Sequence, residues 1–128
     1  MAVPTALDVI LQLTAGLGTF GSSENIALNY NSSDTANRLL RIPYEIAASG
    51  TDTSVNLGTY LDSLKFVIVV DKSNIGVKVG KASGAGKFTV GANKFMVITE
   101  TSTFTVYLDN PDGSNATYGE IIAIGSSA

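Results

Sequence analysis

Hydrophobic and polar residues alternate along most of this chain with a period of two, which is the period of β-strands and not of helices. The longest apolar run, residues 64–71, is rich in β-branched residues and predicts a central strand. Successive residues of a strand lie on opposite faces. The wholly apolar face, which we expect in the core, consists of Leu64, Phe66, Ile68 and Val70. The other face consists of Lys65, Val67, Val69 and Asp71.

Val67 and Val69 make the middle of this second face apolar, so that it also needs a cover. The cover could come from another part of the same chain or from a neighbouring copy. We expect a neighbouring copy, which makes Val67 and Val69 candidate interaction residues.

Shorter alternating segments flank the central strand. They span residues 6–14, 26–30, 38–47, 55–57, 75–79, 88–90, 95–99, 104–108 and 121–124. A proline cannot donate to a ladder, so Pro43 predicts an edge strand whose inward residues are Leu40, Ile42, Tyr44 and Ile46. The segment 15–23, rich in glycine and serine, predicts a loop, and the segment 109–115 predicts a chain reversal.

About nine short strands with turn signals between them predict an all-β fold. We expect an antiparallel β-sandwich, of jelly-roll or immunoglobulin-like type. At 128 residues the chain has the length of one domain, so the sandwich is expected to span residues 1–128.

The chain contains no cysteine and no histidine, which excludes disulfides, thiolate metal sites and every catalytic triad with an imidazole base. A pair of carboxylates could still hydrolyse glycosides. The candidates are Asp71, Glu100, Asp109, Asp112 and Glu120, and nothing in their spacing singles out a pair. We therefore expect no enzymatic activity.

Two glycine-rich motifs suggest nucleotide binding but lack the required context. Residues 16–21 match the dinucleotide fingerprint, but a polar turn and another strand follow where a helix is needed. In the segment 84–87, Phe88 follows the lysine where a phosphate loop needs serine or threonine. We expect no cofactor, no metal, no small-molecule ligand and no nucleic acid. The N-terminus lacks a basic segment and a long apolar run, so neither a signal peptide nor a membrane span is expected.

Lysine is concentrated in the middle of the chain, where six lysines between Lys65 and Lys94 face a single acid, Asp71. Such a charge split can steer one copy against another or against an acidic partner. The candidate interaction residues in this window are Lys78, Lys81 and Lys87. The competing interpretation is that these lysines are solvated and discourage edge-to-edge pairing of strands.

Several features together resemble small structural proteins of tailed bacteriophage particles, such as capsid decoration or cement proteins and minor head or tail components. They are the Met1-Ala2 start, the lack of cysteine and histidine, short turns of Gly, Ser, Thr and Asn, and the strand segments 95–100 and 104–109. The resemblance implies a non-enzymatic β-sandwich that decorates or cements a capsid. Its partners would be copies of itself, with a trimer as one arrangement, and other virion proteins. It would be made in the host cytoplasm and located in the virion.

The alternative is a receptor-binding or carbohydrate-binding β-sandwich module of a tail or fibre, since sandwiches often carry such sites on their loops. The chain has no tryptophan, which counts against a sugar platform.

Overall fold

The first two strands of the chain form a sheet by themselves. The computed structural model describes residues 9–19, 22–32, 38–99 and 102–126, and in it β1 (Val9–Thr19) pairs antiparallel with β2 (Ser22–Ser32). This hairpin belongs to one unit, Met1–Ala36, and all the other strands belong to a second unit, Asn37–Ala128. The expectation of one sandwich over residues 1–128 is therefore wrong for the N-terminal part of the chain.

The loop predicted at residues 15–23 is mostly strand. Gly16 and Gly18 lie within β1, where they pair with Asn25 and Ser23 of β2. Glycine weakens a strand without necessarily ending it, so a loop predicted from glycine content is longer than the actual one. The predicted strand at residues 6–14 begins with residues that lie outside the described part.

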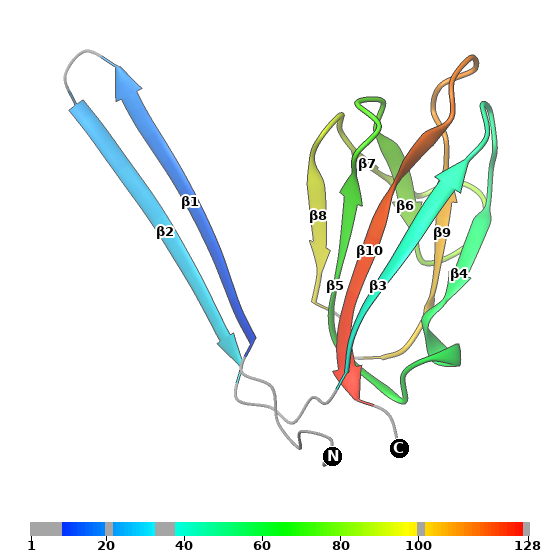
Figure 1. The fold of residues 1–128 in the computed structure, drawn as a ribbon, viewed down its shortest axis with the longest axis horizontal. Coiled ribbons are helices and arrows are strands. Elements are labelled where there is room, and N and C mark those ends of the chain that lie inside the picture. Colours follow the sequence, from blue (N-terminus) through cyan, green and yellow to red (C-terminus); the bar gives the residue numbers. More distant parts are fainter. Residues whose placement is uncertain (1–8, 20–21, 33–37, 100–101, 127–128) are drawn as a thin grey trace. The chain divides into compact units, whose positions relative to one another are not determined.

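The second unit contains eight strands in two four-stranded sheets. The strands are β3 (Arg38–Ile46), β4 (Thr53–Asn56), β5 (Ser63–Asp71), β6 (Val77–Gly80), β7 (Phe88–Val90), β8 (Phe95–Ile98), β9 (Thr105–Asp109) and β10 (Thr117–Ser126). One sheet has the order β3-β10-β5-β8 and the other the order β4-β9-β6-β7 (Figure 1). A 3-10 helix, η1 (Leu57–Thr59), connects β4 to β5. The all-β antiparallel sandwich is thus confirmed.

The strand pairing follows one rule. The first strand of the sandwich pairs with the last, β3 with β10, and the pairs β4 with β9, β5 with β8 and β6 with β7 follow inward, all antiparallel. The strands β3 to β10 form one long antiparallel ribbon, which is rolled so that successive strand pairs belong alternately to the two sheets. This is the jelly-roll arrangement, one of the two that the sequence predicted.

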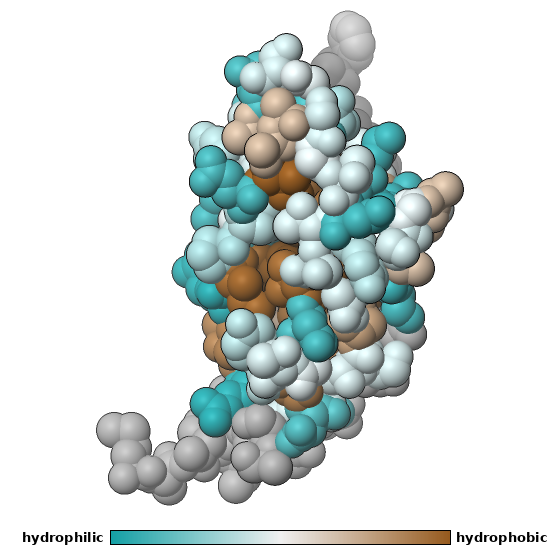
Figure 2. All heavy atoms as spheres, turned by 90° about the vertical axis from the view of Figure 1, so that its right-hand side faces the viewer, coloured by the Kyte–Doolittle hydropathy of each residue, from teal (hydrophilic) through white to brown (hydrophobic). Residues whose placement is uncertain are grey.

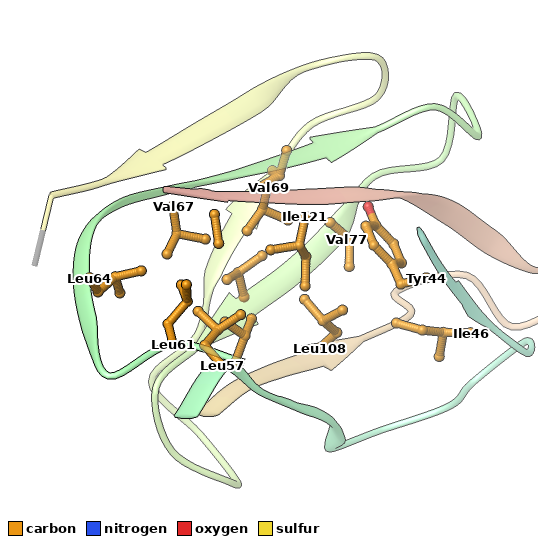
Figure 3. Close-up of a cluster of buried hydrophobic side chains, with 14 residues drawn as sticks. Tyr44, Ile46, Leu57, Leu61, Leu64, Val67, Val69, Val77, Leu108 and Ile121 are labelled. Atoms are coloured by element: carbon orange, nitrogen blue, oxygen red, sulfur yellow. The ribbon is translucent and has the colours of Figure 1, made fainter. Parts of the chain in front are cut away.

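The core lies between the two sheets (Figure 3). Its buried members are Tyr44, Ile46, Leu57, Leu61, Leu64, Val67, Val69, Val77, Val79, Val90, Val106, Leu108, Ile121 and Ala123. Both sheets of the sandwich contribute to it. Pro43 lies on β3 at the edge of its sheet, as predicted.

Leu64 lies in the core as predicted and Phe66 is buried, but from Val67 onward the faces of the central strand β5 are the reverse of the prediction. Val67 and Val69 are fully buried in the core of their own protomer, whereas Ile68 and Val70 are only partly buried and lie on the opposite face. The expectation that a neighbouring copy covers Val67 and Val69 is therefore wrong. The β10 register shifts between Ile124, which pairs with Phe66, and Gly125, which pairs with Leu64.

This shift leaves Lys65 as the extra residue of a β-bulge. Because of the bulge, Leu64 and Val67 both contribute to the core although they are an odd number of residues apart. Strict alternation from Leu64 predicts Ile68 and Val70 in the core. The bulge shifts the alternation by one residue and places Val67 and Val69 there instead.

Tyr44 ties three strands of this sheet together. Its hydroxyl on β3 donates a hydrogen bond to the carbonyl oxygen of Val70 on β5, at 2.8 Å. Between them on β10 lies Gly119, where a Cβ atom would come within 1.9 Å of the same carbonyl oxygen. Glycine at this position thus leaves the space through which the tyrosine reaches across. Burial and the nearby Asp71 carboxylate raise the pKa of Tyr44.

Figure 2 looks onto the side of the molecule along which β3 and β4 run, and shows apolar side chains between polar ones there. These strands carry Leu40, Ile42 and Val55, which are partly buried and pack against the core. No helix in the described ranges is long and apolar enough to cross a membrane.

Candidate functional site

The outer face of the β3-β10-β5-β8 sheet carries a row of apolar side chains. Because Val69 and Ile121 lie in the core, alternation places Ile68, Val70 and Ile122 on the opposite face, where all three are partly exposed. On the same face, Leu39 of β3 is 56% exposed and Phe95 of β8 is 52% exposed. We call this surface the outer sheet face and define its partly exposed residues as Leu39, Ile68, Val70, Phe95, Val97 and Ile122. Phe66 and Ile124, a cross-strand pair on the same face, are buried.

The outer face of the other sheet provides an internal comparison. Its residues alternate with core residues such as Val79 and Leu108 and are largely polar. They are Ser54 and Asn56 on β4, Lys78 on β6, Thr89 on β7, and Thr105, Tyr107 and Asp109 on β9. One sheet of this chain therefore has the polar solvent face that is typical of an antiparallel sandwich, and the other does not.

A charged cluster lies on the outer sheet face itself, because Glu120 pairs with Val70 and Arg41 pairs with Ile122. The guanidinium of Arg41 on β3 donates two hydrogen bonds to the carboxylate of Glu120 on β10, at 3.1 and 2.5 Å, and the ammonium of Lys72 lies 3.2 Å from the same carboxylate. The hydrogen bond from Arg41, with that from Lys72, lowers the pKa of Glu120 against the opposing effect of burial. Two cations thus hold one carboxylate.

The three candidate lysines have different environments. Lys78 and Lys81 are exposed, and the ammonium of Lys81 lies 5.1 Å from the centre of the Phe104 ring. The side chain of Lys87 is only 3% exposed, and its ammonium lies 2.7 Å from Asp52 and 3.3 Å from Asp109. Lys87 is therefore a structural residue, and its choice as an accessible interaction residue is wrong.

Lys87 anchors the loop of residues 81–87, which the sequence pattern suggested to be flexible. Its ammonium donates to the Gly84 carbonyl at 2.5 Å, and the Gly84 amide donates to the Asp52 carboxylate at 2.9 Å. The hydrogen bond to Asp52 raises the pKa of Lys87, and the same contact lowers the pKa of Asp52. The loop is thus fastened to the start of β4 and the end of β9.

Asp71 is a buried structural carboxylate. It accepts hydrogen bonds from the Ser73 hydroxyl at 2.5 Å, from the amide of Asn93 at 2.9 Å and from the amide of Gly76 at 3.2 Å. The Thr117 hydroxyl lies 3.3 Å from it. Burial opposes ionisation, but the hydrogen bonds outweigh burial and hold the pKa of Asp71 below its ordinary value. This carboxylate organises the two turns that follow β5 and β7.

The other candidate carboxylates that the structure describes each have partners of their own. Asp109 faces Lys87, Glu120 faces Arg41, and Asp112 accepts from the amides of Ser114 and Asn115 within its own turn. Glu100 lies outside the described residues. Among the residues that the structure describes, no three acidic side chains gather as a metal site would require.

A groove of about 720 Å³ opens between β8 and the β6–β7 pair. Its lining is mostly apolar and consists of Val79, Lys81, Gly86, Phe88, Met96, Val97, Ile98 and Thr99. Phe88 is the most exposed large apolar residue of the described sandwich. The sequence pattern does not reveal this groove, because the groove forms only where β8, the edge strand of one sheet, lies near β7, the edge strand of the other.

Comparison of the chain with protein-family models gave no match, and neither did searches of curated proteins and of solved structures.

Proposed function

We propose that this chain is a non-enzymatic structural protein of a bacteriophage particle, which decorates or cements the capsid through its outer sheet face. The observation that carries the proposal is the contrast between the two sheets. One sheet has a polar outer face, and the other carries an apolar row with Ile68 and Ile122 at its centre, beside the Arg41–Glu120 ion pair. An exposed apolar patch of this kind marks a surface for another protein.

The energetics suit a repeating assembly. Covering a large apolar side chain completely stabilises a contact by roughly 1.5–3 kcal/mol, and Leu39 and Phe95 are each about half exposed. Association costs roughly 4–15 kcal/mol of lost freedom, so one such face gives a contact of moderate strength. Many copies on a lattice would act together, because each additional contact of a linked array is formed at high effective concentration.

The fold is compatible with this role. Jelly rolls occur in viral capsid domains and in lectin domains. A fold does not determine a function, so the jelly-roll arrangement supports the class of proposal and no single member of it.

The alternative, a receptor-binding or carbohydrate-binding module of a tail or fibre, is supported by the groove between β8 and the β6–β7 pair. The exposed Phe88 ring could stack on a ligand at its border. Binding on a glycan array that is lost in Phe88→Ala would favour this alternative.

The experiment is quantitative mass spectrometry of particles purified from cells that encode the chain. Hundreds of copies per particle would support decoration or cementing. A few tens or fewer would support a tail or fibre component, and absence from the particles would contradict a virion role.

A further inference from the structure

The strand β8 forms an open edge of its sheet (Figure 1). It pairs with β5 on one side, and no strand of the described residues pairs with it on the other. The amide of Asp71 donates to the carbonyl of Lys94 at 3.0 Å, which makes these two residues a hydrogen-bonded pair of the antiparallel ladder. Hydrogen-bonded and non-hydrogen-bonded pairs alternate along such a ladder. The amides and carbonyls of Phe95 and Val97 therefore point away from β5, toward the open edge.

The other three edges of the sandwich carry features that discourage a further strand, whereas β8 does not. Proteins commonly blunt their edges with proline, with charged residues or with very short strands. The edge strand β3 contains Pro43 and two arginines, β7 is three residues long, and β4 is polar in three of its four residues. By contrast, β8 consists of Phe95, Met96, Val97 and Ile98, without proline, glycine or charge. Its edge is thus the one best suited to pair with an added strand.

The groove between β8 and the β6–β7 pair lies beside this edge. Met96, Val97 and Ile98 line it from β8, and Phe88, which is 71% exposed, lines it from β7. A strand added to β8 would lie about 4.8 Å from it, and every second side chain of that strand would point to the groove side. Because the lining is mostly apolar, these side chains are expected to be apolar as well.

We propose that the β8 edge binds an extended segment of a partner protein, which is apolar at alternate positions and carries a carboxylate. Among the described residues that line the groove, Lys81 is the charged one, and Lys94 directly precedes β8. A carboxylate complements these ammonium groups. The same edge of a second copy does not, because residues 91–99 contain one lysine and no acid. Backbone hydrogen bonds would provide affinity, and the alternate side chains would provide specificity.

This binding is separate from the proposed function. Attachment to a capsid is assigned to the apolar row centred on Ile68 and Ile122, whereas the bound segment depends on the backbone of β8 and on the groove. Either proposal can therefore fail without the other. A glycan in the same groove would also be distinguishable, because it does not need the open amides of β8.

The probe is a fluorescent peptide of about eight residues, a common strand length, in which valine alternates with threonine and a glutamate lies at each end. With the valines on the groove side, the threonines lie opposite Phe95 and Val97, so that their amides point to β8 in an antiparallel pairing. N-methylation of the threonine amides should weaken binding to the full-length protein at least about tenfold, while N-methylation of the valine amides should leave it unchanged. Replacement of both glutamates by lysine should also weaken it. Fluorescence anisotropy measures all four affinities.

Val97→Pro provides the matched test in the protein. The Val97 amide points to the open edge, so proline removes no hydrogen bond between β5 and β8 there, whereas Ile98→Pro removes one. Val97→Pro should melt close to the parent and bind the peptide at least about tenfold more weakly. Ile68→Lys should bind the peptide as the parent does.

Equal affinity of the two N-methylated peptides, or no binding of any peptide, would overturn the proposal. So would a lysine peptide that binds as tightly as the glutamate peptide. Hydrogen exchange at the Val97 amide gives a check that does not depend on the folding of Val97→Pro. This amide should exchange rapidly in the protein alone and slowly with the peptide bound. Protection without the peptide would contradict the proposal, because the edge would then already be covered.

Discussion

Ile68 on β5 and Ile122 on β10 are cross-strand partners on the outer sheet face, and both remain partly exposed. Val97 on β8 pairs with Ile68 from the other side, so that an apolar row crosses three strands. Directly behind this row, the neighbouring residues Val67, Val69 and Ile121 are fully buried in the core. At this row the sheet is thus apolar on both faces, as expected where a sheet is covered on both.

Val69→Lys should unfold the sandwich. Val69 is fully buried between the two sheets, and an unpaired ammonium there would cost several kcal/mol against a total stability of about 5–15 kcal/mol. Circular dichroism with a thermal melt checks this expectation. A cooperative melt close to that of the parent would show that the assignment of Val69 to the core is incorrect.

Gly119→Ala should destabilise the protein by about 3 kcal/mol or more, at the upper end of overpacking effects. The new Cβ would lie 1.9 Å from the Val70 carbonyl oxygen and 2.8 Å from the Tyr44 hydroxyl. Tyr44→Phe, which removes only the hydrogen bond, should cost about 1 kcal/mol. Urea denaturation measures both, and equal effects of the two variants would contradict the role assigned to Gly119.

Asp71 should make the stability of the sandwich depend on acid. Its folded pKa lies below its ordinary value of 3.8, so its contribution is present above that pH and is lost as the pH falls through the folded pKa. Asp71→Asn should lower stability at neutral pH by about 1.5–3 kcal/mol, the contribution of a hydrogen bond to a charged group. The variant should also lose part of the acid dependence. Urea midpoints across a pH series provide the measurement, and parallel curves for parent and variant would argue against this role.

The exposed lysines Lys78 and Lys81 should affect docking more than folding. Their replacement by glutamate is expected to leave the melting temperature nearly unchanged and to weaken attachment to particles at low salt, since exposed charges are screened. Lys87→Glu serves as the contrast, because it sets a third carboxylate beside Asp52 and Asp109 and should lower the melting temperature. Equal attachment of the double variant and the parent across a salt series would show that Lys78 and Lys81 are only solvated.

The sequence predicted the sandwich, the edge position of β3 and the central position of β5, because these depend on local alternation and on Pro43. It assigned the wrong face of β5 to the core, since residues 66–70 are apolar on both sides and one bulge at Lys65 shifts the alternation. The true orientation depends on distant residues. Asp71, on the core side, meets Thr117, which is 46 residues away.

The environment of Lys87 likewise depends on residues that are distant in the sequence. A lysine in a glycine-rich segment indicates a solvated loop, and its actual partners, Asp52 and Asp109, are brought to it only by the pairing of β6 with β9 and β7. The sequence could predict that β5 is covered on both faces, because residues 66–70 are apolar on both sides. It could not predict which of these residues lie on the outer sheet face.

Binding of Ile68→Lys to particles that lack the protein tests the outer sheet face most directly. Co-sedimentation with such particles would measure bound copies per particle for the parent, for Ile68→Lys and for Thr89→Lys, an exposed control on the polar face of the other sheet. We expect Ile68→Lys to melt close to the parent and to bind at least about tenfold more weakly, a loss of about 1.4 kcal/mol, while Thr89→Lys binds as the parent does. A folded Ile68→Lys protein that binds as tightly as the parent would contradict assembly through the outer sheet face.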